Sequence, residues 1–359
     1  MSTRSVVPFG PQHPVLPEPI HLDLVLEDEK VVEAIPSIGF IHRGLEKLVE
    51  KKDFNQYVFV AERICGICSY MHGMGYCEAV EHIMNVELPP RAKFLRTIWC
   101  EMSRIHSHLL WLGLLADAFG FESLFMETWR MREKILDMFE ASTGGRVIFS
   151  VNTIGGQRKD MDNDMIRDIL RALTDIEKDL KVVTKTFLDN KAVNSRLRDV
   201  GFLTAQQAQE LGAVGPFMRA SGIARDMRNL GYAAYPEIEL ESITSNVGDS
   251  YARTDVRIRE IFQSIDIIRQ AAGKIPDGPF AVPVKGFPSG EYFMRVEQPR
   301  GEAIYYVKAN GTKFLDRVRV RTPTFANIPA LMETLKGCQL ADVPILILTI
   351  DPCISCTER

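Results

Sequence analysis

Two Cys-x-x-Cys pairs stand far apart in this sequence, and they constrain its fold more than any other feature. The first pair is Cys65/Cys68 and the second is Cys353/Cys356, near the end of the chain. This spacing lets two thiolates converge on one metal, and four thiolates complete a shell for zinc, iron–sulfur clusters or other late metals. If the pairs meet, both ends of the chain are fixed onto whatever lies between them.

Several uses of these cysteines remain open from spacing alone. Seven cysteines in a 359-residue chain do not indicate a disulfide framework. Structural zinc is the main alternative, although zinc pairs usually lie within tens of residues and here roughly 285 intervene. A thioredoxin-like redox pair lacks its βαβ context. We interpret Cys77, Cys100 and Cys338 as buried, inert thiols.

Composition excludes some classes of protein. Hydrophobic residues make up 46% of the chain and charged residues 25%, with a formal net charge of −4. These values are typical of a globular protein and do not indicate a nucleic-acid partner. We find no apolar run near the ~20 residues of a membrane span and no signal peptide. We therefore expect a cytosolic protein that could dock on a membrane protein.

Hydrophobic periodicity predicts more helix than strand. The expected helices are Phe40–Lys52, Pro90 to about Ser142 with a second helix N-capped by Ser123, Asp160–Asp189, Thr204–Leu211 and Asp255–Ala272. The expected strands are a hairpin of His21–Leu26 and Lys30–Ile35, short strands within Ala281–Val320, and Val343–Ile350, with a rigid loop at Pro8–Pro14.

The predicted fold is α+β and mainly α, a long-helix bundle with small antiparallel sheet elements near the termini. We expect a single domain over residues 1–359. Within it, residues 1–60 would form the N-terminal hairpin and helical segment, 61–275 the bundle, and 276–359 the short strands and C-terminal metal loop.

The residues around the cysteines carry a family resemblance. Arg63–His72 has the form Arg-Ile-Cys-Gly-Ile-Cys-x-x-x-His, and Asp351–Arg359 the form Asp-Pro-Cys-x-x-Cys-x-x-Arg. Both resemble the signatures of [NiFe]-hydrogenase large subunits, in the same order. Glu297–Gly301 is similar to the family's Glu-Ala-Pro-Arg-Gly, and Thr322–Asn327 is a looser version of its Pro-Ser/Thr-Thr-Trp-Asn segment.

The resemblance implies a Ni-Fe(CN)2(CO) centre. Cys65 and Cys353 would be terminal nickel ligands. Cys68 and Cys356 would bridge nickel to an iron that carries cyanide and carbon monoxide.

The same resemblance assigns residues around the metals. His72 would donate a hydrogen bond to the Cys68 sulfur. Arg300 would lie over the metals, Thr324 would hydrogen-bond a cyanide, and Asp351 would fix the second loop and pair with Arg300.

Heterolytic cleavage of H₂ needs a Lewis-acid metal and a proton acceptor. Because arginine stays charged, Cys353 is a simpler acceptor than Arg300. The family carries a glutamate where Glu18 stands, so Glu18 is the candidate for onward proton transfer, with a surface carboxylate as the alternative.

The C-terminus carries two further expectations. Glu46 resembles a magnesium-binding position of the family, but the family's C-terminal His is replaced here by Arg359. Family members are trimmed just after this position, so the sequence matches a mature form; a gene that ends there is the alternative.

Other segments resemble the quinone-site core subunit of complex I, namely Gly10–Pro14, Gly39–Gly44 and Pro89–Ala92. Such a mixture is typical of the energy-converting hydrogenases, including the CO-induced type. The complex I relatives lack the paired cysteines, and Pro17 here aligns with their quinone-binding His. The resemblance therefore favours hydrogenase over quinone chemistry.

The resemblance also implies partners. We expect a small subunit with a proximal [4Fe-4S] cluster, further iron–sulfur subunits, and integral membrane subunits that translocate ions. Reduced ferredoxin would exchange electrons with the complex, because this chain has no further cysteine run for an iron–sulfur cluster. The chain would be peripheral, at the cytoplasmic face of the cell membrane.

Metal analysis of the purified protein separates the three hypotheses. A hydrogenase subunit should contain nickel and iron and show infrared bands of metal-bound CO and cyanide. Zinc alone would indicate a structural zinc subunit, and absence of metal a complex I-like subunit.

Overall fold

The computed structural model describes residues 4–359, so the first three residues of the predicted N-terminal segment lie outside it. Its long helices are α3 (Ser69–Met84), α4 (Pro90–Ala118), α5 (Glu122–Thr143), α6 (Asn163–Leu188), α10 (Ser250–Lys274) and α11 (Pro323–Leu335). The short helices are α1 (Leu45–Leu48), α2 (Tyr57–Glu62), α7 (Lys191–Leu197), α8 (Ala205–Glu210), α9 (Pro216–Arg219), α12 (Val343–Thr349) and α13 (Ile354–Glu358). The 3-10 turns are η1 (Val49–Lys51), η2 (Met227–Leu230), η3 (Tyr235–Glu237) and η4 (Leu340–Asp342).

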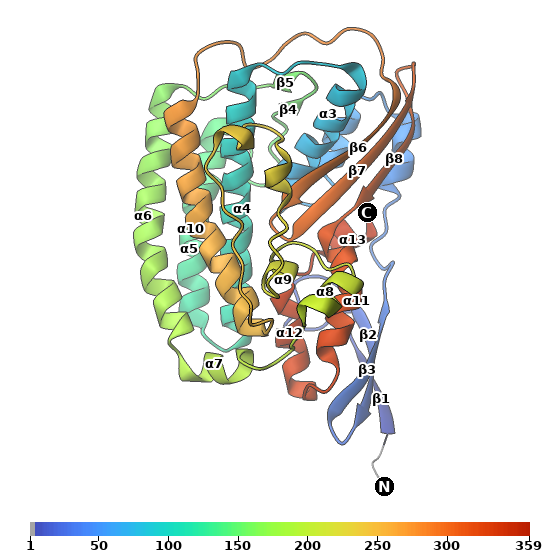
Figure 1. The fold of residues 1–359 in the computed structure, drawn as a ribbon, viewed down its shortest axis with the longest axis vertical. Coiled ribbons are helices and arrows are strands. Elements are labelled where there is room, and N and C mark those ends of the chain that lie inside the picture. Colours follow the sequence, from blue (N-terminus) through green and yellow to red (C-terminus); the bar gives the residue numbers. More distant parts are fainter. Residues whose placement is uncertain (1–3) are drawn as a thin grey trace.

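Three antiparallel sheets accompany the helices. They are β1 (Arg4–Phe9), β2 (His21–Glu27) and β3 (Lys30–Ser37); the small pair β4 (Asn152–Thr153) and β5 (Gly156–Gln157); and β6 (Ser289–Gln298), β7 (Gly301–Asn310) and β8 (Leu315–Arg321). Figure 1 shows α4, α5, α6 and α10 side by side, with β6–β8 beside α3 and the first sheet projecting at one end. The predicted α+β, mainly α fold is confirmed.

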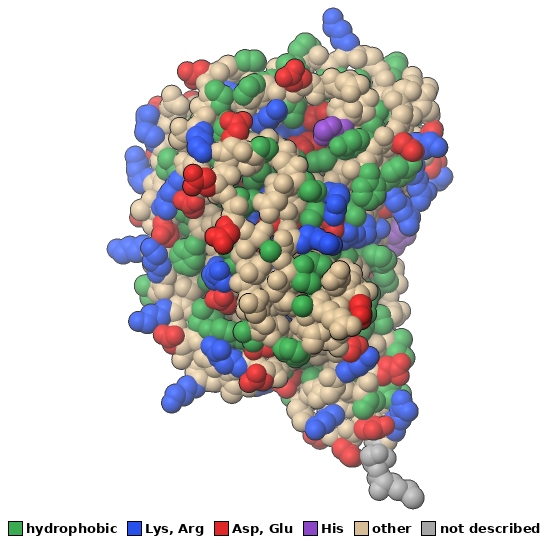
Figure 2. Space-filling model, in the orientation of Figure 1, with side chains coloured by type: hydrophobic (Ala, Val, Ile, Leu, Met, Phe, Trp, Pro, Cys, Tyr) green, Lys and Arg blue, Asp and Glu red, His purple; other side chains and the backbone are tan. Residues whose placement is uncertain are grey.

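The bundle follows from the helical spacing of apolar residues. Helix α6 begins where the Asp162 carboxylate accepts the amide N–H of Met165 at 2.8 Å. It buries one stripe of apolar side chains: Ile166, Ile169, Leu173, Ile176, Leu180, Val183 and Phe187. Helix α4 is buried along most of its length and forms the centre of the bundle. The outer face of the bundle carries charges of both signs (Figure 2).

The helices differ from the prediction in several places, and no predicted helix covers α3. Helix α5 begins at Glu122 after Phe121, so Ser123 is not its N-cap. The helix expected over Phe40–Lys52 is confined to α1 and η1. Helix α11 begins within the segment Thr322–Asn327 and was not predicted.

The predicted strand Val343–Ile350 is wrong, because these residues form α12. Its apolar side chains are buried with α11 and the N-terminal sheet, so β-branched composition does not distinguish strand from buried helix. Pro344 occupies the first turn, where a proline favours a helix start.

The N-terminal hairpin is confirmed as β2 and β3, and β1 pairs with the free edge of β2. Only Pro8 and Phe9 of the expected loop Pro8–Pro14 belong to β1. Leu22, Leu24 and Leu26 point to one side and pack with Leu331 and Leu335 of α11. Within residues 4–359, no helix is both long and apolar enough to cross a membrane.

The β6–β7 turn places Arg300 in the interior. Strand β6 ends at Gln298, pairs with Gly301, and leaves Pro299-Arg300 as a two-residue turn. Arg104 of α4 donates to the Glu297 carbonyl at 2.9 Å, and Arg219 of α9 pairs with the Glu297 carboxylate at 2.7 Å. The turn is therefore anchored on both sides.

A contact between two glycines fixes this turn. Gly215 has φ of 68°, and a Cβ atom there would lie 2.2 Å from Cα of Gly301. Gly215→Ala should therefore lower the free energy of unfolding by about 3 kcal/mol, from backbone strain and overpacking. Gly273→Ala, in open space within α10, should raise it by about 0.5–1 kcal/mol. Equal denaturation midpoints for the two variants would contradict this role.

Candidate metal centre

The two Cys-x-x-Cys loops meet inside the protein. Cys65 and Cys68 occupy the turn between α2 and α3, while Cys353 and Cys356 open α13. The Sγ atoms of Cys65 and Cys353 lie 3.2 Å apart, and those of Cys68 and Cys356 lie 3.3 Å apart. All four are buried free thiols. The structure thus brings the predicted ligand set together.

The donor set fits a late metal. The thiol sulfurs of Cys65, Cys68 and Cys356 all lie within 4.8 Å of one another. A cavity of about 210 Å³ with mostly apolar walls is lined by Ile67 and Pro352, which adjoin the ligands, and by Arg300 and Asp351. Structural zinc sites are closed, whereas catalytic sites keep an open position. The cavity therefore favours a centre that a small molecule can reach.

Arg300 holds the second cysteine loop. Its Nη2 pairs with Oδ1 of Asp351 at 2.8 Å, its Nε donates to the Asp351 carbonyl at 2.7 Å, and its Nη1 donates to Oγ of Ser107 at 3.1 Å. Burial alone lowers the pKa of Arg300, but the Asp351 carboxylate and the cysteine sulfurs raise it above its usual range. The guanidinium remains a cation beside the sulfurs.

The structure corrects the partner of His72. The sequence paired this side chain with the sulfur of Cys68, whereas Nε2 lies 3.3 Å from Sγ of Cys356. On the other side of the ring, Nδ1 contacts the hydroxyl of Tyr305 on β7. Sequence analysis missed Tyr305, because only tertiary packing brings β7 against α3.

The side chain of Glu18 contacts backbone groups of the second cysteine loop. Its carboxylate accepts the N–H groups of Ile354 and Ser355, the latter at 3.3 Å, and the Ser355 hydroxyl at 2.9 Å. Glu18 lines the inner cavity with Arg300 and also a second cavity of about 340 Å³ with His13. It therefore stands where the two cavities adjoin.

Two threonines near the start of α11 support the same loop. Thr324 Oγ1 accepts the N–H of Cys353 at 3.1 Å, and Thr322 Oγ1 donates to the carbonyl of Cys356 at 3.0 Å. Thr324 thus lies at the centre, and its contact with a cyanide stays a prediction.

Arg43 joins the two loops and was missed by sequence analysis. Its guanidinium donates to the carbonyls of Arg63 and Ile64 before the first pair and of Ser355 within the second. Nearby, the Glu358 carboxylate accepts the N–H groups of Gly39 and Ile41, at 2.6 and 2.5 Å. The segment Gly39–Gly44 had carried a family resemblance, but nothing in its spacing indicated this clamp.

Glu46 lies beside the C-terminal residue Arg359, as predicted, and its partners are protein groups. Its carboxylate accepts Nε of Arg359 at 2.9 Å and the N–H of Val320 at 2.8 Å. A magnesium ion would compete with these donors, so the magnesium site stays a prediction.

The other three cysteines lie apart from the centre. Burial raises the pKa of the Cys100 and Cys338 thiols to about 12, and that of Cys77 well above its usual value. They are neutral thiols, consistent with inert residues.

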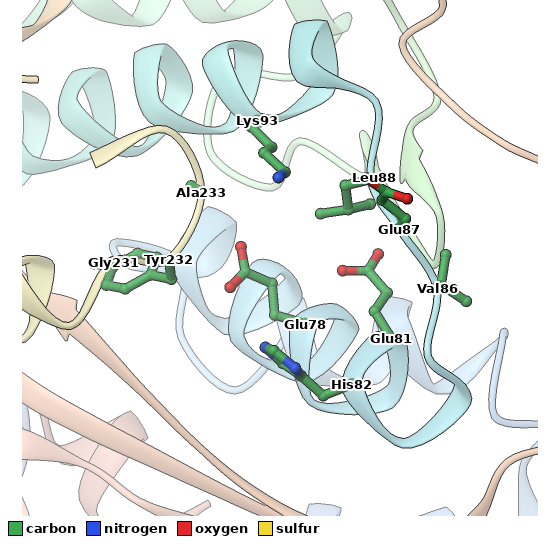
Figure 3. Close-up of a pocket in the computed structure, with 10 residues that line it drawn as sticks. All are labelled: Glu78, Glu81, His82, Val86, Glu87, Leu88, Lys93, Gly231, Tyr232 and Ala233. Atoms are coloured by element: carbon green, nitrogen blue, oxygen red, sulfur yellow. The ribbon is translucent and has the colours of Figure 1, made fainter. Parts of the chain in front are cut away.

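A separate polar cavity of about 200 Å³ adjoins the C-terminal half of α3 (Figure 3). Glu78 and Glu81 point into it, and Lys93 lies across from them. Arg96 pairs with Glu81 at 2.7 Å, while burial raises the pKa of Glu78 to about 7. Arg96 contacts both carboxylates, so the cavity is bordered by a local ionic cluster. This cluster is separate from the four converging cysteines.

Two family models match this chain over different parts. The model described as "Nickel-dependent hydrogenase" matches residues 43–117, which include the first cysteine pair. The model described as "Respiratory-chain NADH dehydrogenase, 49 Kd subunit" matches residues 118–287 and 283–359, which include the second pair.

Individual relatives match the chain from end to end. It is 39% identical to the carbon monoxide-induced hydrogenase of Rhodospirillum rubrum, over 100% of both chains. It is 37% identical to the membrane-bound hydrogenase subunit alpha of Pyrococcus furiosus, over 98% of this chain and 87% of the relative. A chain of the membrane-bound sulfane sulfur reductase, an archaeal respiratory membrane complex, matches with a TM-score of 0.95 and 31% identity, over 99% and 98% of the two chains.

A buried carboxyl next to the first loop gives a pH-dependent prediction. Glu62 is fully buried, and its Oε2 has no partner among the described residues. Burial raises its pKa from 4.5 to about 7, although hydrogen bonds from Asn152 and Ser150 oppose this. Between these values the folded state binds more protons than the unfolded state, so stability falls as pH rises.

Glu62→Gln should therefore leave the unfolding midpoint unchanged near pH 5. Near pH 8 the variant should be more stable than the parent, with a free energy of unfolding higher by on the order of 3 kcal/mol. Thermal unfolding of matched metal-loaded samples measures this, with Glu210→Gln on the surface as control. A variant that is less stable at pH 8 than at pH 5 by the parental margin would contradict the assignment.

Proposed function

The chain belongs to the family that unites nickel-dependent hydrogenases with the 49-kDa subunit of respiratory NADH dehydrogenase, and from this premise we propose that it is the catalytic large subunit of an energy-converting [NiFe] hydrogenase. It would reduce protons to H₂, reversibly, with electrons from reduced ferredoxin. The reaction would be coupled to ion translocation in a membrane arm.

One observation carries the proposal. Four thiols from the two cysteine pairs converge beside a cavity that Arg300 lines. A structural zinc site is fully coordinated by protein ligands and does not need a cavity beside it. The family also includes complex I-like subunits, so quinone reduction is the second candidate. The intact thiol set argues against it, because a quinone site needs no soft ligands.

The four cysteines would hold the metals. Cys65 and Cys353 would hold the nickel, and Cys68 and Cys356 would hold both metals of a Ni-Fe(CN)2(CO) centre. When bound, the centre would supply a Lewis acid that polarises H₂ and a site where electrons from partner subunits reduce protons. His72 hydrogen-bonds the Cys356 sulfur and thereby moderates its basicity.

Protons would move on groups of the chain itself. In the direction of H₂ cleavage, Cys353 is the proposed first acceptor, since its sulfur would be a nickel ligand and its neighbour Ile354 contacts Glu18. Glu18 would then pass the proton from the inner to the outer cavity, both of which it lines. Arg300 would stay charged and hold Asp351 and the cavity wall in place.

Electrons would come from partner subunits. The proposed partners are a small subunit with a proximal [4Fe-4S] cluster, further iron–sulfur subunits and integral membrane subunits, at the cytoplasmic face of the membrane. Relatives named as membrane-bound hydrogenase and respiratory membrane complex support this setting.

Infrared spectroscopy and metal analysis of the purified complex test the proposal. The parent protein should contain nickel and iron and show CO and cyanide bands. Cys65→Ser should lose nickel and at least 100-fold of the H₂ activity, because a terminal ligand is removed. Cys338→Ala, outside the centre, should keep both. Full H₂ activity in Cys65→Ser would overturn the proposal.

Glu18→Gln provides a second arm of the same experiment. It should keep the metals and infrared bands but lower turnover by 10²-fold or more, since glutamine cannot carry a proton. Loss of nickel in this variant would instead indicate that Glu18 only supports the loop.

A further inference from the structure

The sheet β6–β8 packs one face on α3, and its opposite face is exposed except near the Pro299-Arg300 turn, where Glu297 and Glu302 are buried. Met294, Val296, Tyr305, Val307 and Val318 alternate toward the packed face and are buried. The residues between them point outward, because successive side chains in a strand alternate. The outward side chains therefore form an array whose order is set by the strand register.

The outward array carries five cations. We call basic face the group of outward side chains Arg295, Lys308, Arg317, Arg319, Arg321 and Phe293. Register places Lys308 beside Arg317, Tyr306 beside Arg319, and Arg295 and Arg321 on either side of Ile304. Lys and Arg side chains gather over this sheet at the right-hand edge of Figure 2. The concentration contrasts with a formal net charge of −4 for the whole chain.

Among the described residues, three of the five cations have a carboxylate partner, and two have none. Glu302 pairs with Arg295 and Arg321, and Arg319 reaches Glu46 only at 3.5 Å. Within residues 4–359, no carboxylate forms an ion pair with Lys308 or Arg317. Two further exposed acids lie on these strands. Glu291 accepts the Tyr306 hydroxyl at 2.5 Å, and Asp316, beside Arg317, accepts the side-chain amide of Asn310 at 2.6 Å.

We propose that the basic face is the docking surface for a protein subunit whose facing surface is rich in Asp and Glu. The proposal rests on the role as a subunit of a membrane complex proposed above, but not on the identity of the metals. The contact between this sheet and the partner subunit would be independent of the metal centre.

The composition and geometry of the face favour a folded protein over a lipid surface. Four of its five cations are arginines, whose planar guanidinium matches carboxylates in two-point contacts. Phe293, on the edge strand β6, is 55% exposed, and arginine and aromatic residues are enriched in protein interfaces. Arg317, Arg319 and Arg321 repeat about every 7 Å on a rigid strand, a spacing that fixed carboxylates can match.

The β8 edge of the sheet does not compete for this partner. Segment Leu45–Lys51 packs beside β8, and Glu46 accepts the Val320 N–H at 2.8 Å. Strand addition at this edge is therefore blocked, and a partner would dock through side chains. Lys51 and Lys52 extend the positive charge beyond β8.

Zero-length cross-linking of the complex purified from its native membrane tests the contact. A carbodiimide joins an amine to a carboxylate only where the two are in contact. Mass spectrometry should find Lys308 joined to an Asp or Glu of another subunit of the complex. Lys308→Arg should abolish that link without weakening assembly, because it keeps the charge and removes the amine.

Charge reversal supplies the energetic test. The double variant Arg317→Glu, Arg319→Glu should weaken retention of the cross-linked subunit by roughly 100-fold and lower the NaCl concentration that releases it. The matched control is Arg167→Glu, Arg171→Glu on exposed α6, which should assemble like the parent.

Circular dichroism and nickel content separate this proposal from the proposed function. The spectrum and the nickel content of the sheet variant should both equal those of the parent protein. If the parent protein itself contains no nickel, the proposed hydrogenase function fails but the docking proposal does not. Retention of every subunit at the parental salt concentration by the sheet variant would overturn the docking proposal. So would binding of the isolated chain to phosphatidylglycerol vesicles through these arginines, with no cross-link from Lys308.

Discussion

The convergence of four sulfur atoms from two distant parts of the chain is the constraint on which the rest of the structure depends. The paired thiols are separated by 288 residues in sequence and by 3.2 and 3.3 Å in space. Closing so long a segment costs on the order of 5 kcal/mol plus a constant in chain entropy. The long buried helices between the pairs offset this cost, and short polar contacts then set the exact positions.

These polar contacts act on backbone groups more than on the sulfurs. Arg43 binds carbonyls of both cysteine loops, Glu18 and Thr324 bind amides of the second, and Arg300 binds both the carbonyl and the carboxylate of Asp351. A buried ion is costly unless paired, and here the ions are paired with loop groups. The centre is thereby preorganised, with Asp351 held at a positive φ of 56°.

The C-terminal sheet serves two sides of the molecule. On its inner face Tyr305 contacts His72, which in turn contacts the Cys356 sulfur. On its outer face Tyr306, the next residue, lies within the basic array proposed as a docking surface. One strand therefore carries both the support of the centre and the proposed contact with a partner. A rigid element of this kind holds a docked partner at a fixed position relative to the centre.

The sequence by itself singled out the four cysteines that converge, the bundle and the two outer sheets. Cysteine spacing and helical or alternating apolar periods are local properties, so they can be recognised in the sequence without knowledge of packing. The sequence could not distinguish zinc from another metal by spacing, and it assigned α12 to a strand because a fully buried apolar run has no period to read.

Only the tertiary structure decided which groups meet. It placed His72 on Cys356 instead of Cys68, Tyr305 behind His72, Arg43 across both loops and Glu18 between two cavities. These contacts join residues tens to hundreds of positions apart, and their partners depend on how helices and sheets pack. A local pattern names the chemistry that a side chain can do, whereas packing decides which atom it reaches.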